Sequence, residues 1–385
     1  MDHKHSAQER FVKIASELEE ISRWMYEHPE LSLQEHEISA RLAGFLEHQG
    51  FVVEYPAYGM ETAFAARAGS RGPEVIVCAE YDALPGIGHA CGHNLIATAA
   101  LGTGVALVGL TEDLGFRLTI LGTPAEETVG GKIDLIGAGA FADAAAALMV
   151  HPTPEDVVDP AELAIRPITL TFRGRDSHAA MAPEMGVNAL DAFVQAYVNV
   201  STLRQSLLAT DRVHGIINEG GVAANIIPGM TRSSWYVRAG TAERLGVLYE
   251  RVVACFEAAA LATGCTHEID ANEHAFDDLA SDRLLVDLFV ANCADLGRSM
   301  PRRAELPPTP GGSTDMGNVS HVVPAIQPHL GINSGSIVNH QMEFATHTLT
   351  DDGIRMMRDG ALAMAWTVID LAAGDRWGEL GCVPD

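Results

Sequence analysis

Residues 75–94 read VIVCAEYDALPGIGHACGHN, and three kinds of sequence follow one another in this stretch. It begins with an uninterrupted apolar run, Val75–Cys78, continues with an acidic turn, Glu80–Gly86, and ends with a cluster of cysteine and histidine, Gly88–Asn94. A short apolar run without polar alternation is typical of a strand that is buried on both faces of a sheet. The stretch therefore predicts a buried strand that leads directly into a polar cluster.

Two further apolar runs of this kind, Leu118–Leu121 and Ala145–Val150, follow along the chain. Helical patterns, Leu95–Leu110 and roughly Lys132–Phe141, lie between the runs. Another amphipathic helical pattern, from about Ala7 to Glu27, precedes them. Short buried strands that alternate with helices are typical of a mainly parallel sheet flanked by helices, so we expect an α/β fold.

Polar side chains follow each of the three runs. Glu80–Gly86 follows the first, Gly122–Glu127 the second, and His151 the third. The carboxyl ends of parallel strands meet at one edge of the sheet, and ligands bind beyond that edge. We therefore expect these polar clusters to lie together, next to the loop that holds Cys91 and His93.

Cys91 and His93 have the spacing of metal ligands. Alternate residues of an extended or turn segment share a side, so a thiolate and an imidazole two residues apart can reach one ion. His89 falls on the same side and competes as a ligand. The spacing alone fits equally well a buried cysteine beside a hydrogen-bonded structural histidine, and that alternative stays open at this point.

Glu126 and Glu127 form an adjacent pair of acids in a loop. Their side chains diverge, so one can bind a metal ion while the other serves as a base. A bound metal lowers the pKa of its water to about 7, and a nearby carboxylate can then take and return the proton. Taken alone, such a pair is more typical of a solvated loop. Only the other donors expected at the same edge, such as Cys91 and His151, favour the catalytic interpretation.

The pattern changes near residues 160–166. From Ile168–Phe172 onward the order is strand, helix, strand, strand, helix, strand, with helices expected over Ala189–Leu208 and Ala242–Ala262. This order is typical of a small two-layer α+β domain inserted into the first domain. The expected domains are residues 1–163 and 273–385 as the two parts of the α/β domain, and residues 164–272 as the insert.

Composition limits the class of protein. A chain of 385 residues with 47% hydrophobic and 20% charged residues is long enough for two soluble globular domains. Its formal net charge of −26 disfavours binding to nucleic acid or to an anionic membrane. The six cysteines are widely separated, and we find no signal peptide and no run of about 18 apolar residues. We therefore expect a cytoplasmic protein.

Six motifs follow one another over most of the chain. They are Glu80–Gly86 with Gly88–Asn94, Gly122–Glu127, His151-Pro152, Ser177–Pro183, Gly220–Pro228 and Asn339–Phe344. Together they resemble the aminoacylase/carboxypeptidase family of metal-dependent hydrolases, and more narrowly its amidohydrolase branch. This branch includes hippurate hydrolase, auxin-conjugate hydrolases, p-aminobenzoyl-glutamate hydrolase and β-alanyl-lysine-type dipeptidases. The resemblance implies a di-metal exopeptidase-like catalytic domain with an inserted domain that serves as a lid and a dimer interface.

The resemblance also implies two divalent metal ions per subunit, either zinc or manganese. The implied protein ligands are Cys91, which bridges or ligates, His93, Glu127, His151 and His340. His340 stands four residues before Phe344, as the last histidine of the family motif does, and His347 is the second choice. Glu126 matches the general acid/base of the family, and Asp82 matches the aspartate that orients a ligand.

Two residues of the inserted domain belong to the resemblance. His178 matches the histidine that stabilises the tetrahedral oxyanion, often in the active site of a partner subunit, and Asn225 matches a substrate-contacting position. A turn histidine and an asparagine at the start of a strand are the alternatives. The roles of Glu80 and Asp315 stay open, because a turn-capping carboxylate would explain Asp315 as well.

These residues predict a metal-dependent amidohydrolase. It would cleave the amide bond of a small N-acyl amino acid or dipeptide-like substrate through metal-activated water, with Glu126 as the general base. A homodimer formed through the inserted domain is the expected assembly. The alternatives are a hydrolytic deaminase or unusual-amide hydrolase on the same di-metal scaffold, and a non-catalytic metal-binding relative. The presence of Glu126 beside every type of ligand disfavours the non-catalytic relative.

Overall fold

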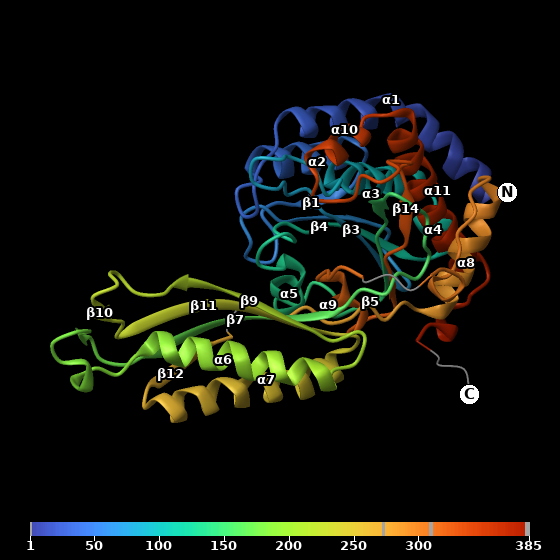
Figure 1. Ribbon diagram of the computed structural model, residues 1–385. Helices are drawn as coiled ribbons and strands as arrows, with labels where there is room; N and C mark the ends of the chain where they lie inside the picture. Colours follow the sequence, from blue (N-terminus) through green and yellow to red (C-terminus); the bar gives the residue numbers. More distant parts are fainter. Residues whose placement is uncertain (1, 272–273, 308–310, 382–385) are drawn as a thin grey trace. The chain divides into compact units, whose positions relative to one another are not determined.

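The structure, a computed structural model, describes residues 2–271, 274–307 and 311–381. The chain forms two compact units (Figure 1). Unit 1 comprises Met1–Pro160, Leu279–Thr309 and Asp315–Asp385, and unit 2 comprises Ala161–Asp278 and Pro310–Thr314. The boundary expected between residues 272 and 273 falls outside the described residues.

Unit 1 is built from helices around one central sheet (Figure 1). Its helices are α1 (His3–Glu27), α2 (His36–His48), α3 (His93–Val108), α4 (Thr111–Leu114), α5 (Gly131–Gly137), α8 (Arg283–Asp295), α9 (Met316–Ser320), α10 (Met342–His347) and α11 (Asp351–Ala373), with short 3₁₀ turns η3 (Arg303–Glu305) and η4 (Trp377–Glu379). Its strands are β1 (Val52–Glu54), β2 (Phe64–Ala68), β3 (Glu74–Ala79), β4 (Arg117–Gly122), β5 (Ala144–Leu148), β6 (His151–Thr153), β13 (Ala325–Ile326) and β14 (His329–Gly331).

The central sheet has the strand order β1-β2-β4-β3-β5-β13. Strands β4, β3, β5 and β13 run parallel, while β1 and β2 add an antiparallel edge. Val75 and Val77 of β3 pack into the core on the side of α1, α3 and α11, and Ile76 and Cys78 pack into the core on the side of α5 and α9. The sheet is therefore buried on both faces, and the expected α/β fold is confirmed.

Helix α3 begins at His93, and it is buried on nearly all sides. It packs against α1 and α11, and its residues from His93 to Leu107 are all buried. Helix α1 covers it with an apolar face whose members recur at steps of three and four residues. They are Ala7, Phe11, Ile14, Leu18, Ile21 and Met25. The start of α3 is thus fixed by tertiary packing.

Unit 2 is a two-layer α+β fold, as expected from the sequence. Its elements are β7 (Ala164–Arg173), β8 (Ser177–His178), η1 (Pro183–Met185), α6 (Ala189–Leu203), η2 (Arg204–Ser206), β9 (Arg212–Glu219), β10 (Ile226–Ile227), β11 (Met230–Ala239), α7 (Ala242–Thr263) and β12 (Thr266–Asp270). The antiparallel order β12-β7-β11-β9 forms a sheet, and α6 and α7 lie side by side on one face of it (Figure 1). Trp235 and Phe256 are in the core between the layers.

The structure differs from the sequence pattern in a few local features. Helix α6 ends at Leu203 rather than Leu208, because the chain tightens into the 3₁₀ turn η2. His151 begins a short strand, β6, which pairs in parallel with β14. Within the described part of the chain, no helix combines the length and apolarity that a membrane span requires.

Candidate metal centre and active site

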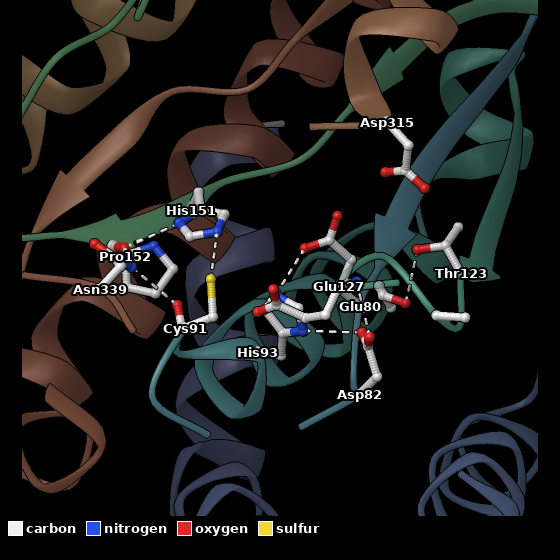
Figure 2. A network of polar contacts seen from close by, with 12 residues as sticks. Glu80, Asp82, Cys91, His93, Thr123, Glu127, His151, Pro152, Asp315 and Asn339 are labelled. Atoms are coloured by element: carbon white, nitrogen blue, oxygen red, sulfur yellow. Dashed lines mark hydrogen bonds and ion pairs between the residues drawn. The ribbon is translucent and has the colours of Figure 1, made fainter. Parts of the chain in front are cut away.

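The polar clusters that follow β3, β4 and β5 meet at the carboxyl ends of these strands (Figure 2). Glu80 and Asp82 come just after β3, and Glu126 and Glu127 follow β4. His151 stands three residues after the end of β5. Parallel β3, β4 and β5 therefore deliver acids and a histidine to one edge of the sheet, as the sequence predicts.

Gly92 sets the geometry of the Cys-x-His segment. It adopts a left-handed conformation, with φ 88°, as the residue before α3. The turn brings His93 to the first position of the helix, where its ring is fully buried. His93 Nδ1 lies 3.0 Å from Asp82 Oδ1. This contact makes Nδ1 the donor and leaves Nε2 as the nitrogen that faces the site.

Cys91 and His151 face each other beside this histidine. Cys91 Sγ lies 3.5 Å from His151 Nε2. His151 Nδ1 lies 2.9 Å from the carbonyl of Pro152, which fixes the ring in the same way as Asp82 fixes His93. The Asn339 amide donates to the carbonyls of Cys91 (3.1 Å) and Pro152 (2.9 Å), so it ties the two loops together (Figure 2).

Glu127 lies next to two histidines, His93 and His340, that are far apart in the sequence. Its carboxylate lies 3.7 Å from His93 Nε2 through one oxygen and 3.4 Å from His340 Nε2 through the other. The backbone N–H of His340 donates to the carbonyl of Ala90 (2.9 Å), which holds this residue against the Cys91 loop. The side chain of His340 is 56% exposed, so the group of donors is open to solvent at this residue.

The potential ligand atoms form overlapping groups within 4.8 Å of one another. One group is Cys91, His93 and His151, and a second is Cys91, Glu127 and His340. A third joins His93 to Glu126 and Glu127. Cys91 belongs to the first two groups, so these groups share one sulfur atom and together offer sulfur, nitrogen and oxygen donors of the kind that bind metal ions.

Two features of the site favour divalent metal ions at these residues. Among the buried side-chain atoms of the described residues, His93 Nε2 and Glu127 Oε1 have no hydrogen-bond partner. Buried polar atoms of folded proteins are nearly always paired, so these two atoms point to a missing ligand. Burial and the Glu127 carboxylate raise the pKa of the Cys91 thiol well above its usual value, so the thiolate needs a cation beside it.

The pKa values of Asp82, His151 and Glu126 are also shifted. Burial alone would raise the pKa of Asp82, but His93 and hydrogen bonds from Ser32 and Glu127 lower it to about 2. Burial lowers the pKa of His151 to about 4, so this ring is neutral and has a lone pair to offer. Burial, together with the neighbouring carboxylates of Glu80 and Glu127, raises the pKa of Glu126.

A buried lysine lies between Glu80 and Asp315. Lys132 Nζ donates to Glu80 Oε1 (2.5 Å) and to Asp315 Oδ1 (2.7 Å), and its backbone N–H donates to Asp315 Oδ2 (2.9 Å). All three side chains are fully buried. Glu80, Glu126 and Asp315 form a further acidic group within 4.8 Å, so Lys132 compensates negative charge next to Glu126.

Other histidines considered from the sequence lie outside these groups. Among the described residues, the ligand groups include His340 but neither His89 nor His347. His89 is buried with both ring nitrogens unpaired, and burial lowers its pKa to about 3. His347 is the last residue of α10. His89 and His347 therefore do not join the donors that the structure brings together.

His178 and Asn225 belong to unit 2, where they are neighbours. The short strand β8 pairs with β10, and the N–H of Ala179 donates to the carbonyl of Asn225 (2.9 Å). His178 Nδ1 accepts hydrogen bonds from the N–H groups of Ala180 and Met181, each at 3.2 Å. The hydrogen of the neutral ring is therefore on Nε2, which is free to act as a donor.

Comparison with known proteins identifies the family. Residues 76–362 match the sequence pattern of the family described as Peptidase family M20/M25/M40. This chain belongs to peptidase family M20/M25/M40. The match includes the Cys91, Glu127 and His340 segments, and the resemblance inferred from the motifs is confirmed.

Individual relatives of this M20/M25/M40 peptidase agree with the assignment. Xaa-Arg dipeptidase of Mus musculus is 40% identical over 382 residues, which cover 96% of this chain and 88% of the relative. A p-aminobenzoyl-glutamate hydrolase polypeptide of Escherichia coli is 31% identical over 285 residues, covering 67% of this chain and 59% of that protein. A Bacillus subtilis crystal structure described as a dinuclear metal binding peptidase from the M20 family has a TM-score of 0.68 at 20% identity, covering 93% of this chain and 98% of that one.

The family membership and these relatives establish the general chemistry. This M20/M25/M40 peptidase is a metal-dependent hydrolase that acts on peptide or amide bonds, and its substrates are small amide compounds. Its donor groups suit a divalent metal.

Several residues that support the ligand groups of this M20/M25/M40 peptidase are not part of any sequence motif. Lys132 is a lone lysine directly after two glycines, and that position near acidic strand ends was a usable signal. Ser32 donates to Asp82 Oδ2 (2.7 Å), and Glu35 accepts from the N–H of Ala125 (2.9 Å). Both come from the connection before α2, far from any motif, and nothing in the sequence pattern marks them.

Proposed function

We propose that this protein hydrolyses the amide bond of a dipeptide-like substrate or a small N-acyl amino acid, with Glu126 as general base and general acid. The observation that carries the proposal is the convergence of five donor side chains in overlapping groups, one of which includes Glu126. These are Cys91, His93, Glu127, His151 and His340, from segments spread over most of the chain.

The donor groups suggest which residues would hold each of two ions. Cys91, His93 and His151 would hold one, and Cys91, Glu127 and His340 the other, with the thiolate shared. Thiolate and imidazole favour zinc, while the carboxylate of Glu127 also suits manganese. Ions bound there would polarise the substrate carbonyl and lower the pKa of water.

Glu126 is the proposed proton carrier. Its carboxylate lies in a donor group with His93 and Glu127, which leaves it next to the metal ligands. In the proposed reaction it takes a proton from the attacking water and then gives this proton to the nitrogen of the departing amine. Asp82 holds the His93 ring through Nδ1, so that Nε2 keeps its direction toward the site.

His178 is the proposed oxyanion donor. Two backbone N–H groups fix Nδ1 as an acceptor, so the Nε2–H group is preorganised to donate to a negatively charged oxygen. Asn225, which is joined to the same short ladder, is the proposed substrate-binding residue beside it. Unit 2 would then act as the lid domain, whose closure or dimer contact brings His178 to a substrate.

The proposed substrate class is based on the similarity to Xaa-Arg dipeptidase. Since Xaa-Arg dipeptidase of Mus musculus is 40% identical over 96% of this chain, we propose dipeptides with a basic C-terminal residue as the first substrates to test. The net charge of −26 favours the approach of cationic substrates over anionic ones.

A homodimer through unit 2 is proposed as the assembly. Strand β9 is at the end of the strand order of its sheet, and Ile216 on it is 65% exposed. Helix α6 exposes Val194, Tyr197 and Val198. An edge strand with exposed apolar side chains, in a domain with a further exposed apolar helix face, is typical of a surface that pairs with a second copy. Light scattering after gel filtration should give twice the chain mass, and a monomer would contradict this part of the proposal.

The test of the reaction is a substrate panel with metal-loaded protein. Dipeptides ending in Arg or Lys, N-acetyl amino acids and aromatic amines would be incubated with wild type, Glu126→Gln and a control, Glu47→Gln, at an exposed position on α2. Glu126→Gln should keep its metal and lose about 10²- to 10⁴-fold in kcat, while the control retains full turnover. Retained turnover in Glu126→Gln would remove the base from the mechanism. Release of ammonia from an amine, with no cleavage of any amide, would replace the proposed reaction by deamination.

A further inference from the structure

The residue before the proposed base has a backbone conformation that needs support. Ala125 has φ 62°, in the left-handed region that residues with a Cβ atom rarely adopt. Its carbonyl accepts a hydrogen bond from the N–H of Gly130 (3.0 Å). Its own N–H donates to the Oε1 atom of Glu35 at 2.9 Å, in a contact that is fully buried. The segment that presents Glu126 and Glu127 is therefore fixed by a side chain from another part of the chain.

The start of helix α2 is capped by an acid other than Glu35. Glu35 occupies the N-cap position of α2, yet its side chain makes no capping hydrogen bond there. The carboxylate of Glu30 accepts from the N–H groups of Glu37 (3.1 Å) and Ile38 (2.8 Å) instead. The Glu35 side chain is thus directed away from its own helix and into the interior, toward the end of β4.

A second contact fixes the orientation of the Glu35 carboxyl group. The hydroxyl of Thr62 donates to Glu35 Oε2 (3.1 Å). Tyr81 in turn donates to the backbone carbonyl of Thr62 (2.6 Å), and both contacts are buried. Glu35 is therefore held at one oxygen by Thr62 and holds Ala125 with the other.

We propose that Glu35 is a positioning residue that sets the place of Glu126 and Glu127 through the backbone of Ala125. Asp82 makes the matching contact on the other side, since its Oδ2 accepts from the N–H of Glu127 at 3.0 Å. The two carboxylates thus bracket Glu126 along the backbone. The expected effect on turnover, which acts through Glu126, rests on the proposed function. The expected effects on backbone exchange and on metal affinity do not.

The proposed role needs an acceptor atom rather than a negative charge. Burial raises the pKa of Glu35 to about 7, so its carboxyl group is held in an environment that disfavours the ion. The oxygen that meets the Ala125 N–H exists in a glutamine as well. Glu35→Gln should therefore preserve the contact, while Glu35→Ala leaves a buried N–H without an acceptor.

The test compares Glu35→Ala with Glu35→Gln and with Glu30→Ala. Glu30→Ala is a matched control, since it removes an acid from the same helix start without touching Ala125. In Glu35→Ala we expect faster hydrogen–deuterium exchange in the peptide that spans residues 121–131, metal affinity about tenfold lower or weaker still, and kcat about 10- to 100-fold lower with KM changed less than about threefold. Glu35→Gln should restore all three, and Glu30→Ala should leave all three unchanged while lowering thermal stability.

The outcomes separate this inference from the proposed function. If wild-type protein cleaves no amide, the proposed function fails, and exchange and metal affinity still decide the role of Glu35. Unchanged exchange over 121–131 and unchanged metal affinity in Glu35→Ala would overturn the inference. If Glu35→Ala does not fold, Thr62→Val provides the test, because Glu35 then loses one of its two contacts. Faster exchange of the same peptide in Thr62→Val supports the inference, and wild-type exchange contradicts it.

Discussion

Replacing Gly92 by alanine should damage the metal centre more than any comparable glycine substitution nearby. Gly92 has φ 88°, a conformation that costs alanine about 1–2 kcal/mol. A Cβ atom added there would lie 2.4 Å from Cγ of Pro152, which is too close for any real contact. Relief requires Pro152 to move, and overpacking of this kind costs about 1–3 kcal/mol. The expected loss in the free energy of unfolding is thus about 2–5 kcal/mol.

The same movement should weaken metal binding. The carbonyl of Pro152 is the partner of His151 Nδ1 and of the Asn339 amide, so a shift of Pro152 turns the His151 ring and loosens the Cys91 loop. Loss of such support lowers metal affinity by about 10- to 100-fold.

Gly86→Ala is the matched control for the clash. Gly86 also has a positive φ, 76°, but its Cβ would meet nothing within 4 Å. Urea unfolding and metal titration of both variants would separate backbone strain, about 1–2 kcal/mol in each, from the clash. If Gly92→Ala matches Gly86→Ala in stability and binds metal like wild type, the reasoning from the Pro152 contact is wrong.

Two further substitutions test the electrostatics. Lys132→Met should lower the free energy of unfolding in urea by about 3–5 kcal/mol, because Glu80 and Asp315 would face each other in the core without their cation. A decrease below about 1 kcal/mol would show that the charges are not paired as described. Burial raises the pKa of Glu162 from 4.5 to about 7 in the folded protein. The free energy of unfolding of wild type should therefore fall as the pH rises from 4.5 to 7, by on the order of 3 kcal/mol from this group. In Glu162→Gln that contribution disappears, and the free energy of unfolding should decline less from pH 4.5 to pH 7 than in wild type; parallel curves would contradict the raised pKa.

Local patterns were sufficient for the architecture. The run Val75–Cys78 has no polar alternation because β3 is buried on both faces, and this is visible in the sequence. The rule that parallel strands end at one edge then brought Glu127 and His151 together without any knowledge of distances. The segment of Cys91 and His93 was placed by the same argument, and the structure brings them to that edge.

Contacts that depend on tertiary packing could not be predicted. The local pattern left open whether His89 or His340 joins the donors, and only the family resemblance named His340. The choice depends on the left-handed turn at Gly92 and on how the last segment of unit 1 returns, and neither is a periodic feature. Lys132 is an ordinary residue in sequence, and only the fold encloses it between two acids. Glu35 shows the same limit, because its partner is a backbone N–H ninety residues away.

The proposed metal centre requires Cys91 to supply a thiolate to both ions. The most direct measurement is the absorption spectrum of the cobalt-loaded protein together with its metal content. Wild type should bind two cobalt ions per chain and show a thiolate-to-cobalt charge-transfer band, and Cys91→Ser should lose the band and bind cobalt more weakly at both sites. A Cys91→Ser variant with two tightly bound ions, or a wild-type spectrum without the thiolate band, would contradict the account.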